Sequence, residues 1–551
     1  MFPRSVVHII ITCCAVHMLL LTGPSIAPAQ DTTPDVFNWV YPQDYWWHLA
    51  AAWDRAAVPD ADSIVYIGNP DDKAFQAYVS HNAAAAEVNL DGGSKAEALT
   101  YLTVYNSSTL TVLNDLNVNN RAILFIKDGD VTARSVTINP GGAIAHRNGV
   151  LTIDGGQFNP LGDHYFLDGS NGGLGSVVVK NGATWDVPQW AYVGYNDAGT
   201  LTIESGAQLT STYARIGFQA TGEGEVTVDG NGSAWINPGS LEVATNNHGE
   251  MTIRNYGHVE NGLGAVGTGT GSVGMVTVTD HGIWTNTSTL HVGGRTAAGG
   301  QGTLIVEDGG SVTAASGVKV WPDGEVHLLS GGVLEATGGN VTLTGGRLLG
   351  NSELIIPADA WLENDGVVDP QRVLRVVGGD YLQQAGGRLE IDLGGPDPEL
   401  HDQLLINDGS ATLGGTLVVS LSNGFVPDPG QRFDIVWAGD GVEGAFADVL
   451  LPTLPGGLSL DVRPVPSGLA LVAVVPEPAG LWLLLAGLAG VLRARRTKFL
   501  GLHSCNVRSA QTSHGDTSTF RGIRRSAGSL GRGPGAPKSL VRIVRQATAT
   551  R

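Results

Sequence analysis

The chain has 551 residues, of which 78 are glycine and only 15% are charged, and its formal net charge is −20. Abundant glycine without a Gly-X-Y period excludes collagen, and a hydrophobic content of 42% excludes general disorder. Residues 493–551 hold 13 Lys or Arg and one acid, which leaves 19 of the 32 basic and 51 of the 52 acidic residues, a net charge of −32, in the rest. Because so acidic a body repels nucleic acid, we expect no nucleic-acid partner.

Residues 1–29 are predicted to be a signal peptide. Arg4 supplies a positive charge, residues 6–21 are mostly apolar, and Ala27 and Ala29 provide the small side chains of a cleavage site. The alternatives are a permanent N-terminal helix and a lipoprotein. The lipoprotein is disfavoured because the apolar run continues beyond its cysteines.

Residues 30–98 are predicted to form an N-terminal cap and the first strands. They are unusually aromatic, with Phe37, Trp39, Tyr41, Tyr45, Trp46, Trp47 and Trp53. We favour the interpretation that these rings cover the first coil of a solenoid, because an open solenoid end exposes unpaired strand edges. The functional alternative is carbohydrate stacking, with Trp46 and Trp47 as candidate glycan contacts.

Residues 99–350 contain an internal repeat. Each unit holds three short apolar segments separated by turn residues. In the first segment of one unit, Leu201 and Ile203 alternate with threonines, which is the period of a strand with one buried face. Clear units begin at glycines spaced 24, 25, 25, 25, 28 and 22 residues apart, namely Gly175, Gly199, Gly224, Gly249, Gly274, Gly302 and Gly324.

Three strands in about 25 residues predict an all-β fold, in which each repeat is one coil of a three-sided parallel β-helix. Each strand then pairs with its counterpart in the next coil, about 4.8 Å away. A β-propeller is the rival fold, but its blades need about 40 residues or more. The repeats also resemble the passenger regions of autotransporter-like adhesins, which are long β-helices, and this resemblance concerns the fold more than the function.

Residues 351–474 differ in character from the repeats. They are predicted to be a β-rich C-terminal cap domain that ends the β-helix and joins it to the segment that follows. A separate carbohydrate-binding sandwich is the alternative.

Residues 475–497 combine a short motif, an apolar stretch and an arginine cluster. As a helix, the 14 apolar residues at 479–492 would be about 21 Å long, which is short for a hydrocarbon core of about 30 Å but can span it with local thinning. The arginines are expected to stay cytoplasmic, which leaves the body outside. The signal residues are Val475, Pro476, Glu477, Pro478, Arg493, Arg495 and Arg496.

This three-part pattern resembles the PEP-CTERM sorting signal of Gram-negative bacteria. The resemblance implies that an exosortase, a membrane transpeptidase, cleaves near the motif and transfers the protein to the surface or to an extracellular matrix. An ordinary C-terminal membrane anchor is the alternative. Members of this family usually end after the arginines, whereas residues 498–551 continue as a basic tail that we expect to be disordered, or to be a gene-model read-through.

The sequence has no Gly-x-Ser-x-Gly elbow, His-Glu-x-x-His pair or phosphate loop, so we predict no enzyme and no catalytic residues. The candidates for carboxylate chemistry on a β-helix are Asp280 with His281, and His258, although isolated residues of this kind are usually solvated. The segment 229–232 is similar to half of a calcium loop and fits a β-turn better. The cysteines lie only at the two ends of the chain, at Cys13, Cys14 and Cys505. We therefore expect no disulfide, metal or cofactor in the body.

The predicted function is that of a structural or adhesive protein at the surface or outer envelope of a Gram-negative bacterium, with the solenoid as spacer and binding surface. Its expected partners are an exosortase-type transpeptidase, the membrane through the C-terminal helix, and extracellular polysaccharide. The alternatives are a polysaccharide-active β-helix enzyme and a glycan-binding surface module.

Overall fold

A computed structural model describes residues 33–41, 43–68, 73–95, 98–140, 142–160, 164–168 and 174–475. These residues form 44 β-strands and three 3-10 helices of three residues each. Of the described strands, 39 belong to one sheet and five to a second. The expected all-β fold is therefore confirmed.

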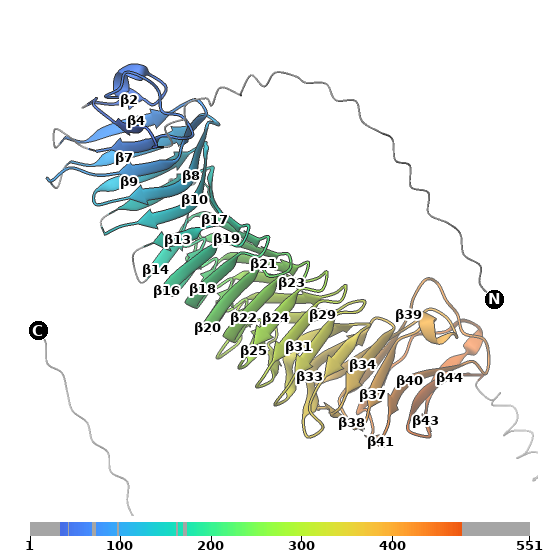
Figure 1. The fold of residues 1–551 in the computed structure, drawn as a ribbon. Coiled ribbons are helices and arrows are strands. Elements are labelled where there is room, and N and C mark those ends of the chain that lie inside the picture. The colour runs from blue at the N-terminus through green and yellow to red at the C-terminus, as the bar shows by residue number, and fades with distance from the viewer. Residues whose placement is uncertain are drawn as a thin grey trace, which may run out of the picture. The chain divides into compact units, whose positions relative to one another are not determined.

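The strands are wound into a parallel β-solenoid (Figure 1). One coil consists of β26 (Gln301–Val306), β27 (Ser311–Ala314) and β28 (Val318–Val320). Each of these strands pairs in parallel with its counterpart in the next coil, so three ladders, called here the first, second and third, run along the solenoid. The counterparts are β29 (Gly324–Leu328), β30 (Val333–Ala336) and β31 (Val341–Gly350). The predicted three strands per coil are confirmed.

The interior is filled by side chains from alternate positions of each strand. In β17 (Ala198–Glu204), Leu201 and Ile203 are buried, while the threonines on either side of Leu201 are half-buried. Their partners in the next coil, Val226 and Val228, are buried as well. Burial of each such side chain contributes about 1.5–3 kcal/mol, and a single coil without neighbours would lose most of it.

Coils are already present before residue 99. Trp39 and Trp47 pack against Trp53 at this end, with ring centroids 5.1 and 5.0 Å apart in edge-to-face arrangements that add to the burial of the rings. The second sheet also lies here, and its parallel strands are β2 (Tyr45–Trp46), β4 (Phe75–Val79), β7 (Thr100–Tyr105), β9 (Ala122–Lys127) and β11 (Ala143–Arg147).

Parallel pairing also continues past residue 350, so the coils extend on both sides of the expected repeat range. Among the described strands, the pairing direction changes at the end, where β44 (Gly468–Val474) runs antiparallel to β40 (Arg432–Ala438) and β43 (Ser459–Val465). The later strands of the first ladder are β33 (Trp361–Pro370), β36 (Arg388–Leu393), β39 (Thr416–Leu421) and β42 (Asp448–Leu450).

Of the predicted targeting residues, only Val475 lies within the described part of the chain, and its side chain is exposed. The predicted transmembrane helix and basic tail lie outside it, together with Ala27, Ala29, Pro476, Glu477, Pro478, Arg493, Arg495 and Arg496. Among the residues that the structure describes, no helix is both long and apolar enough to cross a bilayer.

Candidate functional site

The two predicted glycan contacts lie on opposite sides of the chain, because neighbouring residues of an extended segment point to opposite faces. Trp47 is only 2% exposed and packs against Trp53 in the core, so its assignment as a glycan contact is wrong. Trp46 is half-buried on the outer face, where its ring centroid lies 5.0 Å from that of Tyr78 and 5.7 Å from that of Tyr105.

The candidate residues for carboxylate chemistry lie in a corner and on a separate strand. Asp280 and His281 both have positive φ angles, 47° and 62°, and the His281 ring stacks on Tyr256 with centroids 4.9 Å apart. His258 begins β22 (His258–Val266), and its Nε2 lies 3.3 Å from Thr285 Oγ1. This placement is that of turn and surface residues.

The segment 229–232 also forms a corner, with Gly230 and Gly232 at positive φ. The carboxylate of Asp229 accepts a hydrogen bond from Arg254 Nε at 2.9 Å and another from Asn255 Nδ2 at 2.8 Å. These contacts tie one corner to the next coil, as expected for a β-turn.

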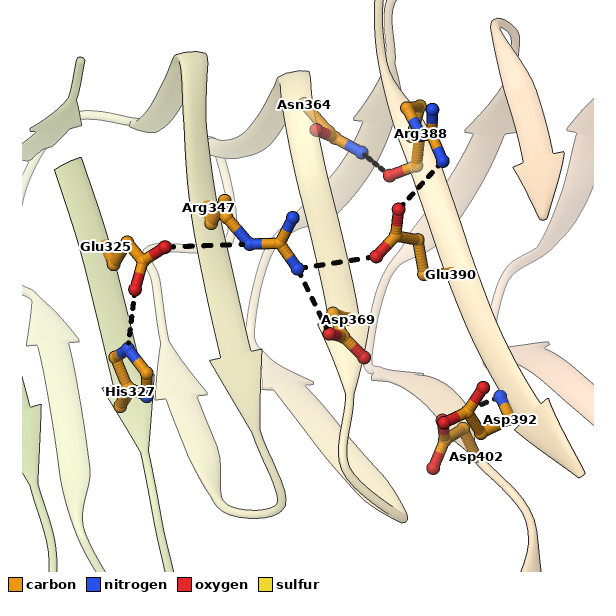
Figure 2. Close-up of polar contacts among 9 residues, drawn as sticks. All are labelled: Glu325, His327, Arg347, Asn364, Asp369, Arg388, Glu390, Asp392 and Asp402. Atoms are coloured by element: carbon orange, nitrogen blue, oxygen red, sulfur yellow. Dashed lines mark hydrogen bonds and ion pairs between the residues drawn. The ribbon is translucent and has the colours of Figure 1, made fainter. Parts of the chain in front are cut away.

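The structure brings together charged residues that the sequence did not single out (Figure 2). Glu325 and His327 belong to β29, Arg347 to β31, Asp369 to β33 and Glu390 to β36. Side chains at alternate positions of paired strands share one outer face, so residues of successive coils meet there. We call these five residues the carboxylate cluster.

Arg347 is the centre of the carboxylate cluster. Its Nη2 lies 3.3 Å from both Asp369 Oδ2 and Glu390 Oε2, and its Nε lies 3.9 Å from Glu325 Oε1. Glu390 also accepts a hydrogen bond from Arg388 Nη2 at 2.9 Å (Figure 2). Each partly exposed pair is worth only about 0–1 kcal/mol, but together they join four successive strands of the first ladder.

The carboxyl group of Asp369 has a raised pKa. Burial and then the charge of Glu390 raise its pKa to about 6, against the opposing attraction of Arg347. A carboxyl that holds its proton beside an ionised one is the arrangement used for acid–base cleavage of glycosides. Here one guanidinium nitrogen contacts both carboxylates and occupies the space between them, where the substrate would have to lie. The geometry therefore favours an ion-pair network over a cleavage site.

A second acid lies beside the cluster. Burial raises the pKa of Asp402 to about 7, although the backbone N–H groups of Arg372 and Asp392 each donate a hydrogen bond to its carboxylate at 2.8 Å. Asp369, Asp392 and Asp402 line one cavity of about 340 Å³. With both of its oxygens bonded to the backbone, Asp402 holds the turn between two coils.

Sequence reasoning missed the carboxylate cluster because its members are far apart in the chain. Arg347 lies 22 residues from Asp369 and 43 residues from Glu390. The signal that could have found them is their register. Arg347 pairs directly with Glu325 across the first ladder, and that pairing becomes visible only once the coil boundaries beyond residue 324 are known.

No family model matches the chain. In an alignment over 346 residues that covers 57% of this chain, the sequence is 28% identical to a protein from Dickeya dadantii (strain 3937) named deoxyribonuclease CdiA. The match covers 10% of the length of that relative. Because so small a share of the relative is matched, the activity in its name is not transferred to this chain.

Proposed function

We propose that the chain is an exported structural or adhesive protein of the cell surface or extracellular matrix, with its solenoid as spacer and binding surface. The observation that carries this proposal is the stack of paired coils from β3 (Ile64–Ile67) to β42. A solenoid buries its core between neighbouring coils, so its outer faces remain available along the stack for binding.

The export route in this proposal comes from the sequence. Residues 1–29 direct secretion, and residues 475–497 are a substrate of an exosortase-type transpeptidase that cleaves near the Pro-Glu-Pro motif. The apolar helix holds the protein in the membrane until cleavage, with the arginines in the cytoplasm.

Both ends of the solenoid are capped in this proposal. The buried tryptophans at the N-terminal end cover the first coil, and β44 lies along the edge of β40. Covered edges matter for a surface protein, because an open strand edge templates aggregation with other chains.

The proposal contains no catalytic step. The carboxylate cluster supplies two acid groups in reach of each other, but Arg347 neutralises and separates them. We infer that the cluster stabilises the later coils.

The test is mass spectrometry of the protein isolated from the envelope of its host. We expect an N-terminus directly after the predicted cleavage site at Ala29 and a C-terminus near Pro478. Glu477→Ala should leave the segment beyond residue 478 attached, because the transpeptidase no longer recognises the motif. Glu443→Ala is the matched control, since Glu443 is an exposed glutamate in the same part of the chain, and this variant should be processed normally.

Surface exposure is measured in the same cells with a membrane-impermeant amine label. A wild-type protein that keeps its N-terminal residues, or that stays unlabelled in intact cells, would contradict the proposal.

A further inference from the structure

On the third ladder, outward-facing positions of successive coils align in one column that runs along the solenoid. In register, it contains Tyr192, Arg215, Glu242, Ala265, His291 and Lys319. At about 4.8 Å per coil, the column is about 24 Å long. Its strands are β16 (Thr184–Val193), β18 (Gln208–Ile216), β20 (Ala234–Val243), β22, β25 (Leu290–Val292) and β28.

The column begins in an aromatic group. The Trp190 and Tyr213 rings are stacked, with centroids 4.6 Å and planes 25° apart, and Tyr213 is 37% exposed. The guanidinium carbon of Arg215 lies 4.5 Å from the centroid of Trp190 and 4.5 Å from that of Phe218. Cation–π contacts of this kind fix the position of the charge at the surface.

From Tyr192 to Lys319, the column holds two cations, Arg215 and Lys319, and one acid, and its next positions in register are Thr342 and Glu363. Its acid, Glu242, is buried and is shared by two arginines, with Arg215 Nε at 3.2 Å and Arg295 Nη1 in direct contact. Arg295 comes from the turn that follows β25, and Lys319 Nζ lies 3.9 Å over the ring of Trp321. We call Trp190, Tyr213, Arg215, Arg295, His291 and Lys319 the cationic strip.

A cavity lies at the Lys319 end of the cationic strip. His291, Lys319 and Asn340 line a cavity of about 380 Å³. His291 Nε2 lies 3.1 Å from Thr289 Oγ1, whereas its buried Nδ1 has no hydrogen-bond partner among the residues that the structure describes. Burial, and then Lys319 and Arg295, lower the pKa of His291, which keeps its ring neutral. A buried polar atom without a partner is rare in folded proteins and marks this position as unusual.

We propose that the cationic strip binds an anionic polysaccharide, with sugar carboxylates paired to Arg295 and Lys319 and sugar rings against Trp190 and Tyr213. The proposal deepens the surface role described above by naming its ligand class. Charge complementarity argues for this ligand, because the strip is a local excess of cations on a strongly acidic body.

Nucleic acid is the alternative ligand, because it is also an anionic polymer and its flat bases could stack against the same aromatic rings. Its dense phosphates are repelled by the net negative charge of the body, and its binding depends on neutralising several phosphates at once. A polysaccharide with one carboxylate per sugar is less densely charged than a double helix, which carries one phosphate charge per about 1.7 Å of its axis, so a few cations spaced along one face suit the polysaccharide better.

The experiment is biolayer interferometry of the purified full-length protein against immobilised polygalacturonate. A neutral β-glucan and oligothymidine serve as the comparison ligands. Arg295→Gln with Lys319→Gln should weaken polygalacturonate binding about tenfold or more, because two charge-assisted contacts are lost. Trp190→Ala should weaken it as well.

The matched control removes two positive charges elsewhere, by Lys180→Gln with Arg254→Gln, whose side chains pair with Asp154 and Asp229 on the first-ladder side. This variant should bind within about twofold of wild type. Equal loss in both double variants, equal binding of the neutral glucan, or tighter binding of oligothymidine would overturn the proposal. Surface labelling of intact cells tests the proposed surface location, whereas interferometry tests polysaccharide binding. Either proposal can therefore fail without the other.

Discussion

Several polar side chains inside the solenoid are paired along its axis. The indole Nε1 of Trp284 donates to Asn261 Oδ1 at 2.6 Å, and Asn261 Nδ2 donates to Asn286 Oδ1 at 2.8 Å. Trp284 and Asn286 lie in β24 (Ile283–Asn286), Asn261 lies in the preceding coil, and all three are buried. An unpaired buried amide costs about 1–3 kcal/mol, so each asparagine depends on the coil beyond it. A pattern of apolar and polar residues could not place these asparagines inside, because their partners lie in other coils.

His146 is buried, and it makes the stability depend on pH. Burial lowers its pKa to about 4 from the ordinary value of 6.5. A lowered pKa means that the folded state binds the proton less well than the unfolded state, so stability is full above pH 6.5 and falls as the pH drops toward 4. The loss attributable to His146 should reach about 3 kcal/mol.

The measurement is urea unfolding of wild type and of His146→Leu between pH 7 and pH 4. Other acids titrate in both proteins, so the difference between the two isolates His146. A difference that stays constant across this range would show that the ring is accessible to protons in the folded state.

At the scale of the strand, glycines mark the coils because backbones meet there. Gly199, Gly224, Gly249 and Gly274 pair with one another along the first ladder. A Cβ atom on Gly249 would lie 2.5 Å from the backbone nitrogen of Ala244, which is closer than Cβ contacts allow. Glycine therefore recurs at the repeat spacing because the backbones approach closely at these positions.

Gly249→Ala should consequently destabilise the fold by about 1–3 kcal/mol, because the neighbouring backbone has to shift. Gly68→Ala is the control, since Gly68 has no positive φ and no atom within 4 Å of its Cβ position. Denaturant midpoints of the two variants provide the comparison. Equal midpoints would mean that the turn beside Gly249 relaxes freely.

The same glycine signal explains what sequence reasoning found and what it missed. Between residues 175 and 324, the glycines precede alternating Thr and aliphatic residues, so the coils were predicted correctly. Beyond residue 324, glycines still precede paired residues of the first ladder, namely Arg347, Val367, Arg388 and Thr416. Charged and irregular strand residues follow them, so the sequence predicts a β-rich cap that ends the β-helix where the coils in fact continue.

At the scale of the molecule, the cationic strip and the carboxylate cluster have the same origin. Each is a group of residues brought together from successive coils, and neither has a local sequence motif. The sequence predicted the coil and the direction in which side chains point. It could not predict the columns, because the lengths of the turns set which residues align, and coil lengths vary from 22 to 28 residues even in the clear repeats.

A stack of this kind should tolerate the loss of one whole coil. Deleting residues 249–273 places Gly274 where Gly249 stood, and Asn237 takes the register position of Asn261 opposite Asn286. All three ladders and the polar contact to Trp284 are then restored between new neighbours.

Deleting 249–261 instead removes part of a coil and leaves the ladders out of register. Because stability is a sum over coils and their interfaces, the first variant should keep a cooperative thermal transition and an unchanged circular dichroism signal per residue. The second should lose cooperativity, and equal damage in both would show that the coils are not interchangeable units.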